Sequence, residues 1–172
     1  MKDNIVLIGM PGVGKSTVGV ILAKILGYKF VDADIVIQEE EGCLLKDIIK
    51  RDGVDGFIEV ENRVNSSLNV HKTIIATGGS VVYGKEAMEH LSEIGTIVYL
   101  ELDYNTLNKR LTNIKSRGVV TKEGQDLMAI YEERIPLYEK YADITVSEVN
   151  LNVEQTIEKI ITALEATNVK DF

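Results

Sequence analysis

The sequence contains few of the residues that mark secreted, membrane or disulfide-rich proteins. Its 172 residues include one cysteine, Cys43, which rules out an internal disulfide, and only two prolines. No run of about 18 apolar residues occurs, so no segment is predicted to span a membrane. The N-terminus lacks the basic start, apolar run and small-residue cleavage site of a signal peptide. We therefore expect a protein of the reducing cytoplasm, in which Cys43 is a buried small apolar residue rather than a nucleophile.

Positive charge is also scarce. The 19 Lys and Arg residues are outnumbered by 27 Asp and Glu residues, which gives a formal net charge of −8 at pH 7. Proteins that bind polyanions by releasing counterions need a basic face, so we expect neither nucleic acid nor a membrane as a partner. An anionic small molecule must instead be caught locally, by a few placed cations or by backbone N–H groups. We expect the protein to be a monomer.

The pattern of apolar segments predicts the fold. The length indicates one domain over residues 1–172. Apolar runs of strand length alternate with helical patterns, which is typical of a parallel sheet covered by helices. We predict a three-layer α/β/α sandwich with a five-stranded parallel sheet. Strands are expected at residues 4–8, 29–31, 73–77, 96–100 and 144–146. Helices are expected at residues 15–26, at 35–68 with breaks near 42 and 53, and at 104–113. Another helix is expected after residue 124 and through about residue 138, and a last one begins at about residue 153.

Helical spacing also predicts which helix faces pack on the interior. In the first helix the spacing places Val18, Ile21, Leu22 and Ile25 on one face. In the long helical segment the same spacing aligns Phe57, Val60, Val64 and Leu68. We expect both faces to be buried.

The segment after the first strand carries a phosphate-binding motif. Gly9-Met-Pro-Gly-Val-Gly14-Lys15-Ser16 fills every fixed position of G-x-x-x-x-G-K-[ST]. Glycines let the backbone wrap an anion with its N–H groups inward, and the next helix adds partial positive charge at its N-terminus. Lys15 can reach the β- and γ-phosphates, and Ser16 can offer its hydroxyl to Mg²⁺. The motif predicts an ATP site formed by Gly9, Gly12, Val13, Gly14, Lys15, Ser16 and Thr17.

The loop alone does not identify the reaction. A GTPase would need an Asn-Lys-x-Asp motif, whereas the single Asn-Lys pair, Asn108-Lys109, is followed by Arg110 and Leu111. The length is too short for a motor or a large ATPase. A small-molecule kinase fits best.

Two carboxylates, Asp32 and Asp34, follow the second strand. Open α/β sheets bind ligands at the carboxyl ends of their strands, so this pair is expected beside the phosphate loop. Phosphoryl transfer needs a carboxylate near Mg²⁺ and often another to accept the proton of the attacking hydroxyl. Capping of the next helix is the structural alternative for either residue.

The order of the motifs along the chain resembles that of the shikimate kinases, over about residues 4–146. The likeness rests on the phosphate loop, Asp32-x-Asp34, Gly78-Gly79 after the third strand, Arg117 in a polar segment, and Arg134-x-x-x-Tyr138. It implies a P-loop kinase fold. It also implies ATP- and Mg²⁺-dependent transfer of the γ-phosphoryl group to a hydroxyl of shikimate, a step of the shikimate pathway of aromatic amino acid biosynthesis.

The resemblance also assigns roles to residues. It implies that Lys15, Asp34 and Arg117 are catalytic, with Asp34 as base or orienter of the acceptor hydroxyl. Arg117 would close over the phosphates from a lid at about residues 114–124, and Arg110 would lie near adenine. Ser16 and Asp32 would hold the metal. The acceptor would bind among helices at about residues 33–70, and its contacts would be Asp34, Phe57, Glu61, Gly78, Gly79, Ser80 and Arg134.

The acceptor half departs from the family pattern. Shikimate kinases usually carry Gly-Glu-x-x-Phe-Arg-x-x-Glu. In this chain Phe57 and Glu61 match, but Ile58 replaces the arginine and Val54 the first acid. By resemblance that arginine shares the acceptor carboxylate with Arg134, and its loss would cost about 1.5–3 kcal/mol of binding. In addition, Ser80 replaces a third glycine, and Gly118 replaces the proline after the lid arginine.

These departures leave several interpretations open. The protein is a weaker shikimate kinase, in which Arg63 or Lys50 compensates, or it phosphorylates another small polyol or hydroxy acid. A nucleoside, nucleotide or gluconate-type kinase is disfavoured, because residues 35–57 hold only Lys46, Lys50 and Arg51 as cations and no aromatic residue before Phe57. A nucleotide-binding regulatory module without turnover would not need the base and the lid arginine.

Overall fold

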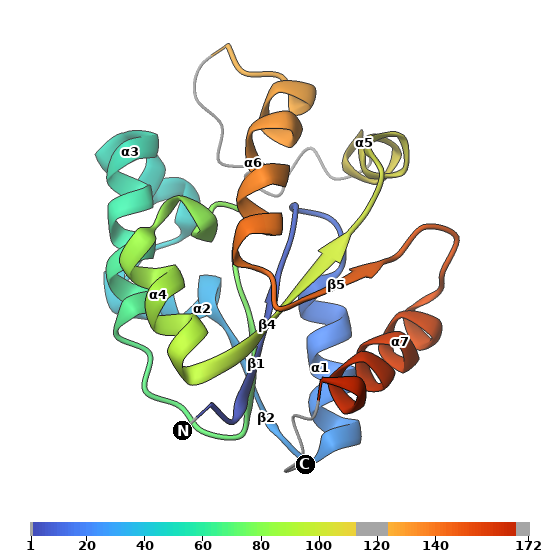
Figure 1. Ribbon diagram of the computed structural model, residues 1–172. Coiled ribbons are helices and arrows are strands. Elements are labelled where there is room, and N and C mark those ends of the chain that lie inside the picture. Colours follow the sequence, from blue (N-terminus) through green and yellow to red (C-terminus); the bar gives the residue numbers. More distant parts are fainter. Residues whose placement is uncertain (1, 113–123, 168–172) are drawn as a thin grey trace.

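A single five-stranded parallel sheet forms the centre of the computed structural model, which describes residues 2–112 and 124–167 (Figure 1). The strand order is β2-β3-β1-β4-β5, and every neighbouring pair is parallel. This confirms the predicted sheet. The strands are β1 (Asn4–Ile8), β2 (Lys29–Asp32), β3 (Thr73–Ala76), β4 (Gly95–Glu101) and β5 (Ile144–Ser147).

Helices cover both faces of the sheet, which makes the fold a three-layer α/β/α sandwich. Helices α1 and α7 pack together on one face, and α4 and α6 pack on the other, where α4 also contacts α3 (Figure 1). Helix α2 packs between β2 and α3. The helices are α1 (Lys15–Leu26), α2 (Ala33–Glu41), α3 (Leu45–Ser66), the 3-10 turn η1 (Val81–Tyr83), α4 (Lys85–Ile94), α5 (Tyr104–Thr112), α6 (Leu127–Tyr141) and α7 (Val153–Ala166).

One part of the structure is absent from the sequence-based prediction. No element is predicted for residues 81–94, where the structure has η1 and α4. Helix α6 continues through Pro136, as predicted, and ends at Tyr141 rather than near Tyr138, although a proline removes a backbone donor and favours a helix end. Burial of Ile130, Arg134 and Tyr138 on one side of α6 holds the helix together across that position. The predicted break at Gly53 is present, with φ 74° and ψ 179° inside α3.

Buried residues of β1, from Ile5 to Ile8, form the middle of the core, because a central strand is covered on both faces. Helix α1 contacts the sheet through Val18, Gly19, Leu22 and Ala23. The predicted packing of Ile21 and Ile25 is wrong, since these side chains are 38% and 57% exposed. The small residues Gly19 and Ala23 let α1 approach the sheet closely, and this turns its buried face away from Ile21 and Ile25.

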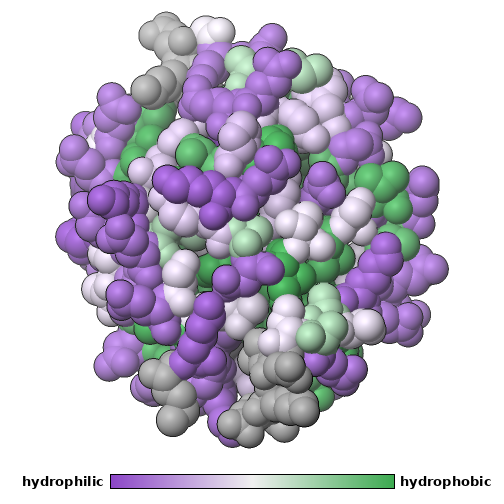
Figure 2. Space-filling view, viewed as in Figure 1, coloured by the Kyte–Doolittle hydropathy of each residue, from purple (hydrophilic) through white to green (hydrophobic). Residues whose placement is uncertain are grey.

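Hydrophilic residues predominate on the face of the molecule seen in Figure 2, with apolar residues between them near the centre. Within the part of the chain that the structure describes, no helix is long and apolar enough to cross a membrane. Cys43 is partly buried rather than fully buried, and it packs against a small cluster formed by Ile37, Ile48, Phe57 and Val64.

Candidate functional site

The carboxyl ends of β1, β2 and β3 converge on one cavity. Register places Leu7 of β1 and Asp32 of β2 on either side of Ala76 of β3, so the segments that follow the three strands start at the same edge. The cavity has a volume of about 250 Å³. It is lined by Pro11, Gly12, Gly14, Lys15, Ser16, Thr17, Asp34, Leu45, Phe57, Glu61, Thr77, Gly78, Gly79, Ser80, Leu111 and Arg134. Most of the residues predicted for phosphate and acceptor binding are therefore brought together.

The phosphate loop runs from β1 to the N-terminus of α1. Gly14 caps α1 at φ 95°, a left-handed conformation that costs glycine little. Lys15 is 7% exposed, and its Nζ donates to the backbone oxygens of Gly9 (2.7 Å) and Met10 (2.9 Å). Burial lowers the pKa of Lys15 to about 8. The lysine is thus held over the loop, in the wall of the cavity.

Asp32 is the last residue of β2 and the N-cap of α2, and Asp34 lies in the first turn of α2. The Asp32 carboxylate accepts from the backbone N–H of Asp34 (3.0 Å) and from Ser16 Oγ (2.8 Å). Asp32 therefore caps α2 and is also hydrogen-bonded to Ser16 of the phosphate loop. Helix capping by Asp32 is thus compatible with a role in phosphoryl transfer. Asp34 projects into the cavity, where burial first, and the charge of Asp32 second, raise its pKa.

Residues Ser16 and Asp32 fit a Mg²⁺ site of the kind that nucleotides complete. Mg²⁺ usually keeps several waters and binds one or two protein oxygens together with phosphate oxygens. The hydroxyl and the carboxylate already meet at 2.8 Å beside the loop. Among the described residues, no group of three or more His, Cys, Asp and Glu side chains could hold a metal without such a ligand.

Gly78 and Gly79 let four side chains approach the backbone closely. A Cβ on Gly78 would lie 2.6 Å from Glu61 Oε2 and 2.9 Å from Asp34 Oδ1. A Cβ on Gly79 would lie 2.6 Å from Pro11 Cδ and 3.1 Å from Arg134 Nη1. Any side chain at these positions would displace the charged groups of the cavity, so the glycines are explained by packing.

Glu61 and Ser80 form a buried pair in the wall of the cavity. Glu61 is 1% exposed, and Ser80 Oγ donates to its Oε1 at 2.6 Å. Glu61 Oε2 has no hydrogen-bond partner within the described part of the chain. Burial raises the pKa of Glu61 to about 7, against the hydrogen bond from Ser80, which lowers it.

Arg134 reaches the cavity from α6 and is 2% exposed. Its Nε donates to Tyr83 Oη at 3.4 Å, and its guanidinium lies 5.4 Å from the centre of the Tyr83 ring. Tyr83 in turn donates to Glu133, and Tyr138 Oη donates to the backbone oxygen of Gly79. These contacts fix α6 against the Gly79 segment and orient the arginine.

Ile58 does not line the first cavity. It lines a neighbouring cavity of about 230 Å³, with Val54, Asp55, Tyr83, Gln125, Glu133 and Arg134. The two cavities share Arg134, so the residue that replaces the family arginine still lies on the Arg134 side of the site. Its apolar side chain offers no hydrogen bond there.

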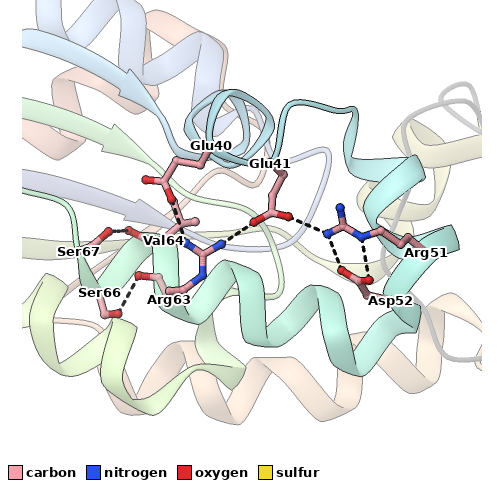
Figure 3. A network of polar contacts seen from close by, with 8 residues as sticks. All are labelled: Glu40, Glu41, Arg51, Asp52, Arg63, Val64, Ser66 and Ser67. Carbon is pink, nitrogen blue, oxygen red and sulfur yellow. Dashed lines mark hydrogen bonds and ion pairs between the residues drawn. The ribbon is translucent and has the colours of Figure 1, made fainter.

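Neither proposed substitute for the missing arginine lies at the cavity. Arg63 pairs with Glu40 and Glu41 on the outer side of α3, where Glu41 also pairs with Arg51 (Figure 3). Lys50 is exposed and does not line the cavity. Compensation by Arg63 or Lys50 therefore has no support in the arrangement of the side chains.

A further cavity of about 310 Å³ lies on the other side of the phosphate loop. It is lined by Val13, Gly14, Thr17, Val18, Arg110, Glu148, Leu151, Asn152, Val153 and Thr156. Arg110 Nη1 is 4.0 Å from Glu148 Oε2, and burial raises the pKa of Glu148 to about 7. Arg110 thus lines a cavity that adjoins the phosphate loop at Val13 and Gly14.

Glu148 is not among the residues predicted for the site, although its position in the sequence carries a signal. The residue directly follows β5, just as Asp32 ends β2 and Asp34 comes two residues later, and the carboxyl end of a parallel strand is where a polar residue meets ligand. Leu45 and Leu111 were also missed, since apolar lining residues carry no motif. Arg117 and most of the predicted lid lie outside the described residues.

Comparisons with known proteins agree on one family. The family model described as shikimate kinase matches residues 11–165. A shikimate kinase from Sulfurihydrogenibium sp. is 34% identical over 163 residues, which cover 94% of this chain and 98% of the relative. One from Thermodesulfovibrio yellowstonii is 36% identical over 165 residues, which cover 94% and 95%. The solved structure of Acinetobacter baumannii shikimate kinase in complex with shikimate superposes with a TM-score of 0.85 at 29% identity, covering 99% of this chain and 97% of that one.

Proposed function

Because this chain belongs to the shikimate kinase family, we propose that it transfers the γ-phosphoryl group of ATP to a hydroxyl of shikimate. The observation that carries this function is the junction of the phosphate loop with a cavity that holds Asp34 and Arg134. A carboxylate for the hydroxyl proton and a buried arginine for a carboxylate are what a hydroxy-acid acceptor needs.

In the proposed reaction, the acceptor hydroxyl attacks the γ-phosphorus while Asp34 accepts its proton. The bond between the γ-phosphorus and the bridging oxygen breaks, and ADP leaves. Lys15 offsets negative charge on the phosphates, and Arg117 is proposed to add a second cation over them. The nucleotide contacts proposed are Gly9, Gly12, Val13, Gly14, Lys15, Ser16, Thr17 and Arg110.

Arg134 is proposed to bind the acceptor carboxylate, and Phe57, Gly78, Gly79 and Ser80 to shape the pocket around its ring. Ser16 and Asp32 would hold Mg²⁺. When bound, Mg²⁺ would neutralise charge on the phosphate oxygens. The Ser16–Asp32 hydrogen bond keeps both protein oxygens at the edge of the loop.

The direct test is ADP release with Mg-ATP and shikimate. Wild-type protein should release ADP only when shikimate is present. Asp34→Asn should lower kcat by about 10²- to 10⁴-fold, which is the usual share of a general base, while binding of Mg-ATP is retained. Unchanged turnover in Asp34→Asn would remove the assignment of the base.

A second candidate is a different small polyol or hydroxy acid, favoured by Ile58 and Ser80 in the acceptor half of the site. A panel of cyclic and linear hydroxy acids in the same assay separates the two candidates. ADP release with another alcohol, and none with shikimate, would replace shikimate by that acceptor and leave the phosphoryl-transfer groups as assigned.

A further inference from the structure

The cavity lined by Asp34 and Arg134, here called the acceptor cavity, contains the buried carboxyl group of Glu61, which forms no ion pair with a described residue. None of the ion pairs formed among residues 2–112 and 124–167 involves Glu61, and its Oε2 has no hydrogen bond there. Ser80 holds the other oxygen at 2.6 Å. An ionised carboxylate in this position would carry the cost of a buried and incompletely satisfied charge.

Helix α3 supplies no arginine to this group. The position three residues before Glu61 would place a cation next to it on the helix, and that position is Ile58. The next arginine, Arg63, is engaged by Glu40 and Glu41 away from the cavity (Figure 3). The charge balance of Glu61 therefore depends on groups contributed by other elements.

Four charged or titratable groups face Glu61 from these elements. They are Lys15 of α1, Asp34 of α2, and Arg134 and Tyr138 of α6. The Lys15 ammonium is held by the oxygens of Gly9 and Met10. Asp34 Oδ1 and Glu61 Oε2 lie on the same side of Gly78, each within 3 Å of the point where a Cβ would be. Two carboxyl groups placed so closely cannot both ionise without a large penalty.

We propose that Glu61 is a positioning residue that must be a neutral acid when the acceptor binds. This inference rests on the proposed function, because it concerns how an anionic acceptor is accepted. A neutral Glu61 leaves Asp34 as the ionised carboxylate that receives the hydroxyl proton. It also draws none of the charge of Arg134 away from the acceptor carboxylate. An ionised Glu61 would compete with the acceptor for that charge. Above neutral pH, therefore, Glu61 must take up a proton when the acceptor binds.

Ser80 influences the pH at which Glu61 changes from the neutral to the ionised form. Its hydroxyl donates to Glu61 and so favours the ionised form, whereas burial and Asp34 favour the neutral form. Burial is the largest influence and raises the pKa of Glu61 to about 7. The residue therefore changes charge within the physiological range.

The test is the pH dependence of KM for shikimate, measured between pH 6 and 8.5 at saturating Mg-ATP. In the wild type, KM should rise about tenfold from pH 6.5 to pH 8, as linkage to one proton requires. In Glu61→Gln, which is neutral at every pH, KM should stay near its low-pH value. In both proteins kcat should follow the same pH profile, because Glu61 acts on binding.

Matched variants locate the effect. Ser80→Ala should move the rise in KM to higher pH, and Ser80→Thr, which keeps the hydroxyl, should restore the wild-type profile. Glu59→Gln removes an exposed carboxylate from the same helix and should change nothing. The proposal would be overturned if KM of the wild type did not change with pH. It would also be overturned if KM rose with pH by the same factor in the wild type and in Glu61→Gln.

A second measurement needs no acceptor. Titration of ¹³C-labelled glutamate by NMR, with Glu61→Gln to assign the signal, should give a midpoint near 7 in the free protein. A midpoint near the ordinary value of 4.5 would overturn the proposal even if shikimate is turned over. If no turnover with shikimate occurs at any pH, the proposed function fails while the NMR titration still decides the state of Glu61.

Discussion

At the scale of single residues, Glu61 links the acceptor cavity to the stability of the fold. Its pKa rises from 4.5 to about 7 because the side chain is fully buried. Between these two values the folded state binds more protons than the unfolded state, so the contribution of Glu61 to stability falls as pH rises. The loss is complete above pH 7.

Glu61→Gln should therefore gain stability relative to the wild type as pH rises. The gain between pH 4.5 and 7.5 should reach about 3 kcal/mol, because each pKa unit is worth about 1.4 kcal/mol. Urea unfolding at pH 5, 6, 7 and 8 measures it, and the exposed variant Glu59→Gln serves as the control. A difference between Glu61→Gln and wild type that is constant with pH would contradict the burial argument.

Ile58 offers a second prediction at this scale. Ile58→Arg would extend a guanidinium along the cavity of about 230 Å³ that Ile58 shares with Arg134. A second charged partner for the acceptor carboxylate is worth about 1.5–3 kcal/mol, so KM for shikimate should fall roughly ten- to a hundred-fold with little change in kcat. Ile58→Met adds length without charge and should leave KM unchanged. If Ile58→Arg and Ile58→Met lowered KM equally, the lower KM would be due to packing rather than to charge.

At the scale of elements, α2 and α3 are joined by an exposed ion-pair network. Glu41 at the end of α2 pairs with Arg51 and Arg63, which stand on the two segments of α3 separated by Gly53 (Figure 3). The network fixes the two helices that supply Asp34 and Glu61. Its arginine side chains are half-exposed, so water and salt weaken each pair.

Arg63→Ala should lower the free energy of unfolding by less than about 1 kcal/mol, as is usual for exposed ion pairs. It should change KM for shikimate by less than about twofold, because Arg63 faces away from the cavity. Steady-state kinetics beside urea unfolding measures both quantities, with Arg134→Ala as the contrasting variant. A large rise in KM for Arg63→Ala would revive the idea that Arg63 replaces the missing arginine.

At the scale of the whole molecule, the strand order decides how the two halves of the site meet. The central strand β1 leads into the phosphate loop, β2 and β3 lead into the acceptor segments, and β5 leads to Glu148 beside the third cavity. A nucleotide bound as proposed would therefore contact segments from both halves of the sheet. The ligand should stabilise the molecule as a unit.

Mg-ATP at about 100 times its Kd should add about 2.7 kcal/mol to stability and raise Tm by roughly 5–10 °C. Thermal unfolding followed by circular dichroism measures the shift. ATP with a chelator should give a smaller shift than Mg-ATP, and Asp32→Asn should reduce the difference between them. Equal shifts with and without Mg²⁺ in the wild type would contradict the Ser16–Asp32 metal site.

The sheet, the phosphate loop and the family could be predicted from the amino-acid sequence. Local signals suffice for these features, because a loop of glycines between a strand and a helix binds phosphate through its own backbone. The positions of Lys15, Ser16, Asp32 and Asp34 follow from the parallel sheet, which brings the carboxyl ends of β1 and β2 to one edge.

Tertiary structure alone decided the environment of the acceptor. The sequence could not show that Glu61 would be buried beside Asp34, that Ser80 would donate to it, or that Arg63 would be engaged elsewhere. It likewise placed Ile21 and Ile25 on the buried face of α1, whereas Gly19 and Ala23 determine how that helix packs. The burial of a side chain, and with it the charge state of a group such as Glu61, depends on contacts with segments far apart in the chain. The helical spacing of residues carries no information about these contacts.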